Sequence, residues 1–275
     1  MLTVVGAGKA SPGATAAAIA LALAWPREVL LVDGDPAGGD VLAGLLPGRA
    51  SADAGLLTWS AQTRRESAMD AVTAIPGHVL SLPEAPNVWV MPGVQSAVQS
   101  SAVVAGWARI AQALERVSST TGRDVIVDAG RFGESSCWPV AAAADQVVVV
   151  ARGSARSVTA TVSALELLTR KIGDADLAAL LVLQRGPYSP AQVAAATGCP
   201  LLGCLGFDAS AAAVLTEGAA SGLGRLRRSR LMRSATQVAR SLAELGARDA
   251  ATSPPAGASR WAHGTSEERE EHIDG

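Results

Sequence analysis

The sequence is poor in aromatic residues and has almost no excess of charge of either sign. Aromatic residues make up 3% of the 275 residues, whereas hydrophobic residues as a whole make up 49%. A core of small aliphatic side chains suits helices packed closely on a parallel sheet. The formal net charge is −2, so no overall field favours nucleic acid or an anionic membrane as a partner. Any electrostatic role must come from local patches.

Cysteines and long apolar segments are scarce as well. Cys137, Cys199 and Cys204 form no Cys-x-x-Cys pair and no metal-ligand spacing, which is typical of reduced thiols in a cytosol. The longest apolar run, residues 16–25, is too short to cross a bilayer. The first residues lack the basic segment of a signal peptide. We therefore expect a cytoplasmic protein without a metal site built on cysteine.

Buried strands and helices alternate along most of the chain. Strands are predicted for residues 2–5, 29–32, 87–93, 124–130, 145–151, 177–185 and 199–208, and helices for residues 15–24, 100–118, 157–172 and 229–245. Unbroken runs of Val, Leu and Ile are typical of strands buried on both faces. The pattern predicts an α/β fold: a doubly wound, mainly parallel sheet of about seven strands with helices on both faces.

The composition divides the chain into one domain and a tail. We expect the domain to cover residues 1–249. Within it, residues 44–86 are rich in Ala, Ser, Pro and Gly and are predicted to hold short helices and mobile loops. From Ala250 the composition changes to Ser, Pro and Gly and then to "SEEREEHIDG". This change predicts a disordered acidic tail over residues 250–275.

A glycine-rich loop, "GKASPGAT", follows the first predicted strand. It departs from the phosphate-binding pattern Gly-x-x-x-x-Gly-Lys-[Ser/Thr] at Ala14, which stands where the lysine belongs. Lys9 instead lies directly after the first glycine. Backbone N–H groups and the N-terminus of the next helix can hold phosphate there, and the Thr15 hydroxyl suits Mg²⁺. The cofactor-binding residues predicted in this loop are Gly8, Lys9, Gly13, Ala14, Thr15 and Ala16.

Aspartates end two further predicted strands. Asp33 and Asp35 close the second strand in "LLVDGDPAGGD", and Asp128 closes "VIVD". Ligands bind beyond the carboxyl ends of parallel strands, so these carboxylates and the loop should meet at one edge of the sheet. Each signal alone is also typical of a turn or a helix cap. Their combination predicts a nucleotide–magnesium site in which Thr15, Asp33 and Asp128 hold the metal.

Four segments, "GKASPGAT", "VLLVDGDPAGGD", "DVIVDAG" and "ADQVVVVARGSARSV", resemble successive motifs of the ParA/MinD superfamily of P-loop ATPases. In that family a signature lysine directly follows the first glycine of the loop, and Lys9 falls on that position. Ala10 and Ser11 stand in place of two glycines, and Ala14 in place of the Walker lysine. The resemblance covers about residues 1–246.

The resemblance also implies roles for individual residues. Lys9 and Asp35 are catalytic, Asp35 by positioning the attacking water. Asp128 is the Walker B carboxylate. The late strands "LVLQRG" and "LLGCLGFD" resemble those whose ends contact adenine, although Phe207 stands where the family usually has proline. The implied adenine contacts are Gln184, Arg185 and Asp208.

The function that the resemblance implies is a homodimer that forms on binding ATP and Mg²⁺ and positions a cargo through a cargo or adaptor protein. Loss of the Walker lysine removes charge that stabilises phosphoryl transfer, about 3 kcal/mol or more, so we expect weak or impaired hydrolysis. One alternative is a non-hydrolysing localisation scaffold similar to TadZ/CpaE factors of pilus or secretion assembly. Another is a metabolic ligase similar to dethiobiotin synthetase, for which the sequence shows no substrate motif.

The segment "RLRRSRLMR" has five arginines in nine residues. The ordinary interpretation is a solvated helix face. The functional interpretation is non-specific contact with DNA phosphates, because members of the resembling superfamily can bind DNA in this way. The acidic tail argues against membrane anchoring, since an anionic bilayer would repel it. The candidate DNA contacts are Arg225, Arg227, Arg228, Arg230 and Arg233.

Overall fold

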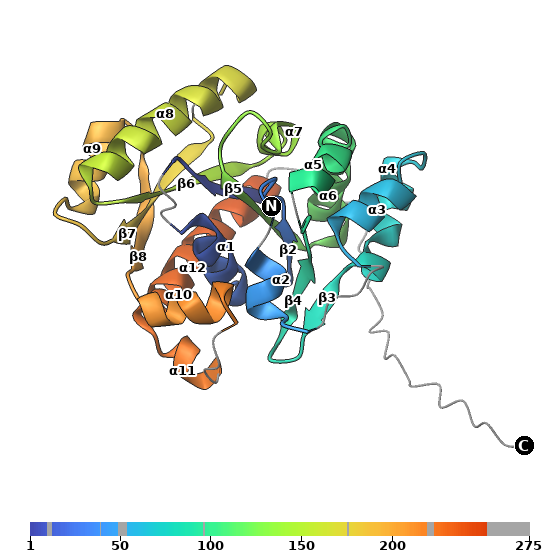
Figure 1. The fold of residues 1–275 in the computed structure, drawn as a ribbon, viewed down its shortest axis with the longest axis horizontal. Helices are drawn as coiled ribbons and strands as arrows, with labels where there is room; N and C mark the ends of the chain where they lie inside the picture. The colour runs from blue at the N-terminus through green and yellow to red at the C-terminus, as the bar shows by residue number, and fades with distance from the viewer. Residues whose placement is uncertain are drawn as a thin grey trace, which may run out of the picture.

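An eight-stranded sheet runs through the centre of the molecule in the computed structural model (Figure 1). The structure describes residues 1–9, 13–38, 40–48, 54–95, 97–174, 176–218 and 223–251. The strand order is β3-β4-β2-β5-β1-β6-β7-β8, and every neighbouring pair is parallel except β3 and β4. The strands are β1 Leu2–Ala7, β2 Val29–Asp33, β3 Leu80–Leu82, β4 Ala85–Met91, β5 Asp124–Arg131, β6 Gln146–Arg152, β7 Ala178–Gln184 and β8 Leu201–Gly206.

The seven parallel strands are the seven predicted from the sequence, and the doubly wound α/β fold is confirmed. The strand that the sequence missed is β3, which pairs with the edge of the sheet in antiparallel orientation. It has three residues, too few to show a recognisable apolar period. It lies within residues 44–86, where short helices were predicted and are present.

Helices cover both faces of the sheet because alternate residues of each strand face opposite sides. In β2, Leu30 and Val32 belong to one core and Val29 and Leu31 to the other. Helices α3 to α9 contribute to the first core, and α1, α2 and α10 to α12 to the second. The helices are α1 Ala14–Leu23, α2 Asp40–Leu45, α3 Leu56–Gln62, α4 Ala68–Ala74, the 3₁₀ helix η1 Ile75–His78, α5 Ala97–Val104, α6 Trp107–Thr121, α7 Trp138–Ala142, α8 Ala155–Ile172, α9 Pro190–Thr197, α10 Ala209–Thr216, α11 Leu223–Arg227 and α12 Arg230–Ala251.

The helix predicted over residues 100–118 is two helices, α5 and α6. The break falls at Gly106, where a Cβ atom would lie 2.9 Å from the Ser60 hydroxyl oxygen of α3. Close packing against α3 therefore coincides with the interruption. The short helices α7, α9, α10 and α11 were not predicted, because five to eight residues carry little helical periodicity.

Two sequence expectations lie largely outside the described residues. The first two residues of the tail predicted from Ala250 belong to α12, which continues to Ala251, and residues 252–275 are not described. Residues 10–12 of the glycine-rich loop are not described either. Among the described helices, none is both long and apolar enough to cross a membrane.

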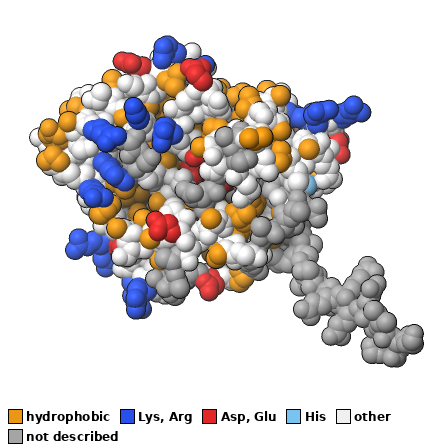
Figure 2. Space-filling view, viewed as in Figure 1, with side chains coloured by type: hydrophobic (Ala, Val, Ile, Leu, Met, Phe, Trp, Pro, Cys, Tyr) orange, Lys and Arg blue, Asp and Glu red, His pale blue; other side chains and the backbone are white. Residues whose placement is uncertain are grey.

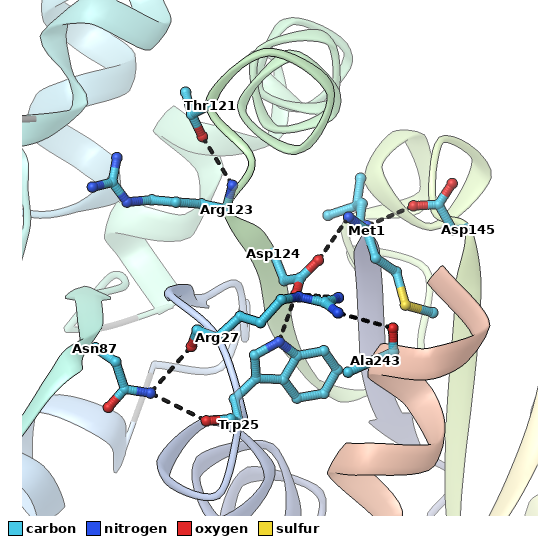
Figure 3. Close-up of polar contacts among 10 residues, drawn as sticks. Met1, Trp25, Arg27, Asn87, Thr121, Arg123, Asp124, Asp145 and Ala243 are labelled. Carbon is cyan, nitrogen blue, oxygen red and sulfur yellow. Dashed lines mark hydrogen bonds and ion pairs between the residues drawn. The ribbon is translucent and has the colours of Figure 1, made fainter. Parts of the chain in front are cut away.

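The buried carboxylate of Asp124 forms a polar network at the amino ends of the central strands (Figure 3). Asp124 accepts hydrogen bonds from the Met1 amino group at 2.9 Å and from the Trp25 indole N–H at 2.7 Å. Arg27 pairs with the same carboxylate at 2.7 Å and donates to the Ala243 carbonyl of α12 at 3.1 Å. This network joins β1, β5, the α1–β2 connection and α12, at the edge opposite the predicted site.

Candidate functional site

The predicted site residues meet at the carboxyl edge of the parallel strands. Along the strand order β2-β5-β1-β6-β7-β8, carboxylates come first, then the β1–α1 loop, then arginines. Asp33 is the last residue of β2, and Asp128 lies opposite it on β5, which continues to Arg131, whereas Arg152 and Gln184 are the last residues of β6 and β7. The aspartates therefore lie on one side of the loop and Arg152 and Arg185 on the other, while Arg131 ends β5 on the side of the aspartates.

The N-terminus of α1 is available to an anion. Gly13 adopts a left-handed conformation with φ 98°, and no side chain caps the helix among the described residues. The first helical hydrogen bond runs from the Ala17 N–H to the Gly13 carbonyl at 2.9 Å. The N–H groups of Ala14, Thr15 and Ala16 precede it and have no acceptor within the helix. Such a terminus binds phosphate through these donors and the helix dipole.

Three carboxylates cluster at the same edge of the sheet, on β5, which pairs with β1, and at the end of β2. Asp33 and Asp128 are paired in register on neighbouring strands, and the Gly34 N–H donates to the Asp128 carbonyl at 2.8 Å. The carboxylate of Asp35 lies against Gly130, where a Cβ atom would come within 2.0 Å of Asp35 Oδ2. Gly130 also has φ 58°, so both its left-handed backbone conformation and the close Asp35 carboxylate disfavour a side chain there. Neighbouring like charges disfavour the ionised form of these carboxyl groups, so a cation would relieve their repulsion.

Asp33 has a buried carboxylate oxygen, Oδ2, without a hydrogen-bond donor among the described residues. The residue is 1% exposed. Burial, then the neighbouring Asp128, raises the pKa of Asp33 well above its usual value, although the Asp35 N–H opposes the shift. A buried acceptor without a donor is costly unless a cation approaches it.

These residues fit Mg²⁺ only in company with phosphate and water. Within the described part of the chain, no group of three or more His, Cys, Asp or Glu residues is arranged to hold a metal ion. Mg²⁺ usually takes one or two protein carboxylates and completes its shell with waters and substrate phosphates. The Asp33 oxygen and the adjacent α1 terminus match that division of ligands.

The basic side of the edge carries an aromatic ring. The Arg185 guanidinium lies 4.3 Å from the centre of the Phe207 ring, a cation–π distance. Asp208 caps α10, accepting the Ala211 N–H at 3.0 Å, and the Gln184 side chain is exposed. The predicted adenine contacts thus lie together at the ends of β7 and β8, with Asp208 engaged as a helix cap.

No family model matches the sequence, and no curated protein matches it either. Solved structures match its fold. A ParA family ATPase from Chlorobium tepidum has a TM-score of 0.71 at 16% identity, covering 87% of this chain and 98% of that one. For MinD from Pyrococcus horikoshii complexed with Mg-ADP the TM-score is 0.68 at 16% identity, with 89% and 97% covered. For a complex of a Cyanothece McdA variant with ATP it is 0.63 at 19% identity, with 88% and 96% covered.

This chain has the ParA/MinD fold. The resemblance inferred from four short motifs is thereby confirmed for the architecture. At identities of 16% to 19%, the match concerns the ParA/MinD fold rather than any activity.

Three basic residues near the site, Arg131, Arg152 and Arg156, were not predicted as site residues. Lys9 shares a groove of about 640 Å³ with Arg131, Arg156 and the small side chains of α8. Arg152 lies near Arg185, and burial followed by that neighbour lowers the pKa of Arg152. Arg131 and Arg152 end strands β5 and β6, so the strand-end rule that selected the aspartates could have found them.

Glycines allow the segments that carry these basic residues to pack closely against one another. A Cβ atom on Gly8 would lie 2.2 Å from the Ala160 carbonyl oxygen of α8, and one on Gly186 would lie 2.1 Å from the Gly153 carbonyl oxygen. The Gly153 N–H donates to the Arg185 carbonyl at 3.0 Å. Gly8 was predicted as a phosphate-loop glycine, and the structure adds a packing reason for it.

The arginine cluster lies beside this basic side, on α11, on the turn that follows it and on the first turn of α12. Arg227 donates to the Glu84 carbonyl at 2.7 Å, and Arg225 and Arg228 line a cavity of about 250 Å³ with Asp208. Figure 2 shows Lys and Arg side chains gathered on the half of this face that carries α8 to α11. The exposed arginines of the cluster are Arg225, Arg227, Arg228, Arg230 and Arg233.

Proposed function

We propose that this protein binds ATP with Mg²⁺ at the carboxyl edge of its sheet and acts as a nucleotide-switched homodimer in intracellular positioning or partitioning. The observation that carries the proposal is the buried, unpartnered oxygen of Asp33 on the same edge of the sheet as the uncapped N-terminus of α1. The ParA/MinD fold supports it, because two matched structures hold Mg-ADP or ATP.

Each proposed role follows from the position of the residue at the carboxyl edge of the sheet. Gly13 and the N–H groups of Ala14 to Ala16 hold phosphate, while Thr15, Asp33 and Asp128 take up the metal. When bound, Mg²⁺ neutralises charge on the phosphate oxygens. Asp35 orients the attacking water, and Lys9 reaches the phosphates bound by the other copy.

The base is held at the opposite end of the edge. Gln184, Arg185 and Asp208 surround the predicted adenine position, and Phe207 offers a ring on which a base can stack. Because Arg185 now covers that ring at 4.3 Å, binding requires the guanidinium to move aside or to cover the base instead.

A second candidate function is a localisation scaffold that does not hydrolyse ATP. Ala14 favours it, since this side chain is 7% exposed and supplies no charge to the phosphates. The cargo or adaptor protein is common to both candidates. The exposed arginine cluster keeps non-specific DNA as a predicted additional partner.

The test is Mg²⁺–ATP binding followed by size-exclusion chromatography with light scattering. ATP is expected to shift the protein from monomer to dimer, and Lys9→Ala is expected to abolish the shift. Lys171→Ala is the matched control, because Lys171 is the only other lysine and pairs with exposed Glu134 at the far end of α8. A protein that neither binds ATP nor changes size with it would refute the switch and leave the scaffold.

A further inference from the structure

The exposed side of α12 carries a row of arginines, with one acidic residue, Glu244, on the turn after Arg240. Arg230, Arg233 and Arg240 are all exposed and follow helical spacing along one face. The opposite face, which includes Leu231, Ala235 and Leu242, is buried in the core. Arg230, Arg233 and Arg240 form what we call the α12 arginine row.

None of the three residues of the α12 arginine row forms an ion pair with a carboxylate among the described residues. The sequence contains no Asp or Glu between Glu217 and Glu244. A concentrated patch of one sign raises the local concentration of an oppositely charged partner.

The same chain carries a segment of complementary charge. Residues 266–275 contain Glu267, Glu268, Glu270, Glu271 and Asp274, with Arg269 as the one basic residue. This segment lies outside the described residues and follows the end of α12. We propose that residues 266–275 dock on the α12 arginine row of the same chain.

The length of the chain permits this contact. A helix rises 1.5 Å per residue, so Arg240 lies about 16 Å and Arg230 about 31 Å from Ala251 along α12. The residues between Ala251 and Glu267 can span at most about 50 Å when extended, and about 20 Å on average as a flexible chain. A tethered segment also has an effective concentration in the millimolar range, which makes weak exposed ion pairs sufficient for docking.

The test uses carbodiimide, which joins a carboxylate directly to an amine and leaves arginine unchanged. The full chain is prepared with Arg230→Lys, Arg233→Lys and Arg240→Lys, which keeps the charge of the row. Background is low, since the natural chain has two lysines, Lys9 and Lys171. Mass spectrometry of the monomer band is expected to show amide bonds from these lysines to Glu267, Glu268, Glu270 or Glu271 at low salt, with a loss of most of this product at high salt.

A matched control variant carries Arg64→Lys, Arg65→Lys and Arg116→Lys, three exposed arginines on other helices and loops. Its introduced lysines should form at most about a tenth of the amide product with the glutamates of residues 266–275. The Lys171–Glu134 pair, 2.7 Å apart, serves as an internal standard for reagent activity. Equal tail products in the two variants, tail products in neither, or tail products confined to a dimer band would each overturn the proposal.

Discussion

The buried position of Asp33 favours cation binding but lowers the stability of the folded protein at neutral pH. Its carboxyl group is buried next to Asp128, and one of its oxygens has no partner among the described residues. Burial and the neighbouring charge raise its pKa well above the ordinary value. A raised pKa means that the folded protein binds this proton more tightly than the unfolded chain. The contribution to stability is therefore present at acidic pH and is lost as pH rises through the folded pKa.

Asp33→Asn is expected to stabilise the protein at neutral pH, because it removes a buried charge next to Asp128. We expect a gain of about 1 kcal/mol or more at pH 7.5 that fades toward pH 4.5. Urea unfolding at both values measures it, with Glu115→Gln on exposed α6 as the charge control. An equal gain at both pH values would contradict the electrostatic explanation. Mg²⁺-dependent nucleotide binding should be lost in the same variant.

Ala14 marks the departure from a complete phosphate loop. A lysine at this position would start in the first turn of α1, beside the proposed phosphates. Ala14→Lys is expected to raise ATP hydrolysis by about tenfold or more, because charge near the transferring phosphoryl group stabilises the transition state. Phosphate release measures it, and Ala16→Lys in the same turn is the control. No gain in a variant that still binds ATP would show that the remaining site is not competent.

Helix α8 is positioned against the β1–α1 loop by backbone contact rather than by side chains. Gly8 allows the approach to Ala160, and Gly153 and Gly186 allow the loops after β6 and β7 to meet. These contacts hold Lys9, Arg131 and Arg156 around one groove. The chemistry of the groove thus depends on how closely two elements pack.

Gly8→Ala is expected to push α8 away from the loop, because the added Cβ would lie 2.2 Å from a backbone oxygen. Overpacking of this kind costs about 1–3 kcal/mol, measured as a lower melting temperature without nucleotide. Gly133→Ala is the control, since an added Cβ there meets no atom within 4 Å. An unchanged melting temperature for Gly8→Ala would limit the role of Gly8 to phosphate contact.

At the amino edge of the sheet, hydrogen bonds and ion pairs to Asp124 join several elements of the fold. Its carboxylate gathers Met1, Trp25 and Arg27, and Arg27 extends the network to α12. The partners are separated by 97 to 123 positions in the sequence from Asp124. A buried charge with several donors is stable only while all of them remain in place.

Asp124→Ala is expected to lower the free energy of unfolding by about 3–5 kcal/mol, because it leaves buried donors and a charge without a partner. Chemical denaturation measures this loss. Glu134→Ala is the comparison, since it breaks an ion pair at the surface and should change stability little. Nucleotide binding by the folded fraction should persist, as Asp124 lies at the edge opposite the site. A loss of binding equal to that of Asp33→Asn would contradict this separation.

Local patterns were sufficient to predict the seven parallel strands and the aspartates toward the carboxyl ends of two of them, although β5 continues past Asp128 to Arg131. Strand burial appears as an apolar run, and a strand-end carboxylate is visible in the same few residues. The antiparallel strand β3, the break at Gly106 and the packing role of Gly8 could not be predicted, because they depend on contacts between distant segments. The same is true of the Asp124 network and of the groove around Lys9. Sequence order specified which groups lie at the strand ends, whereas tertiary packing decided which of them share one site and how deeply Asp33 is buried.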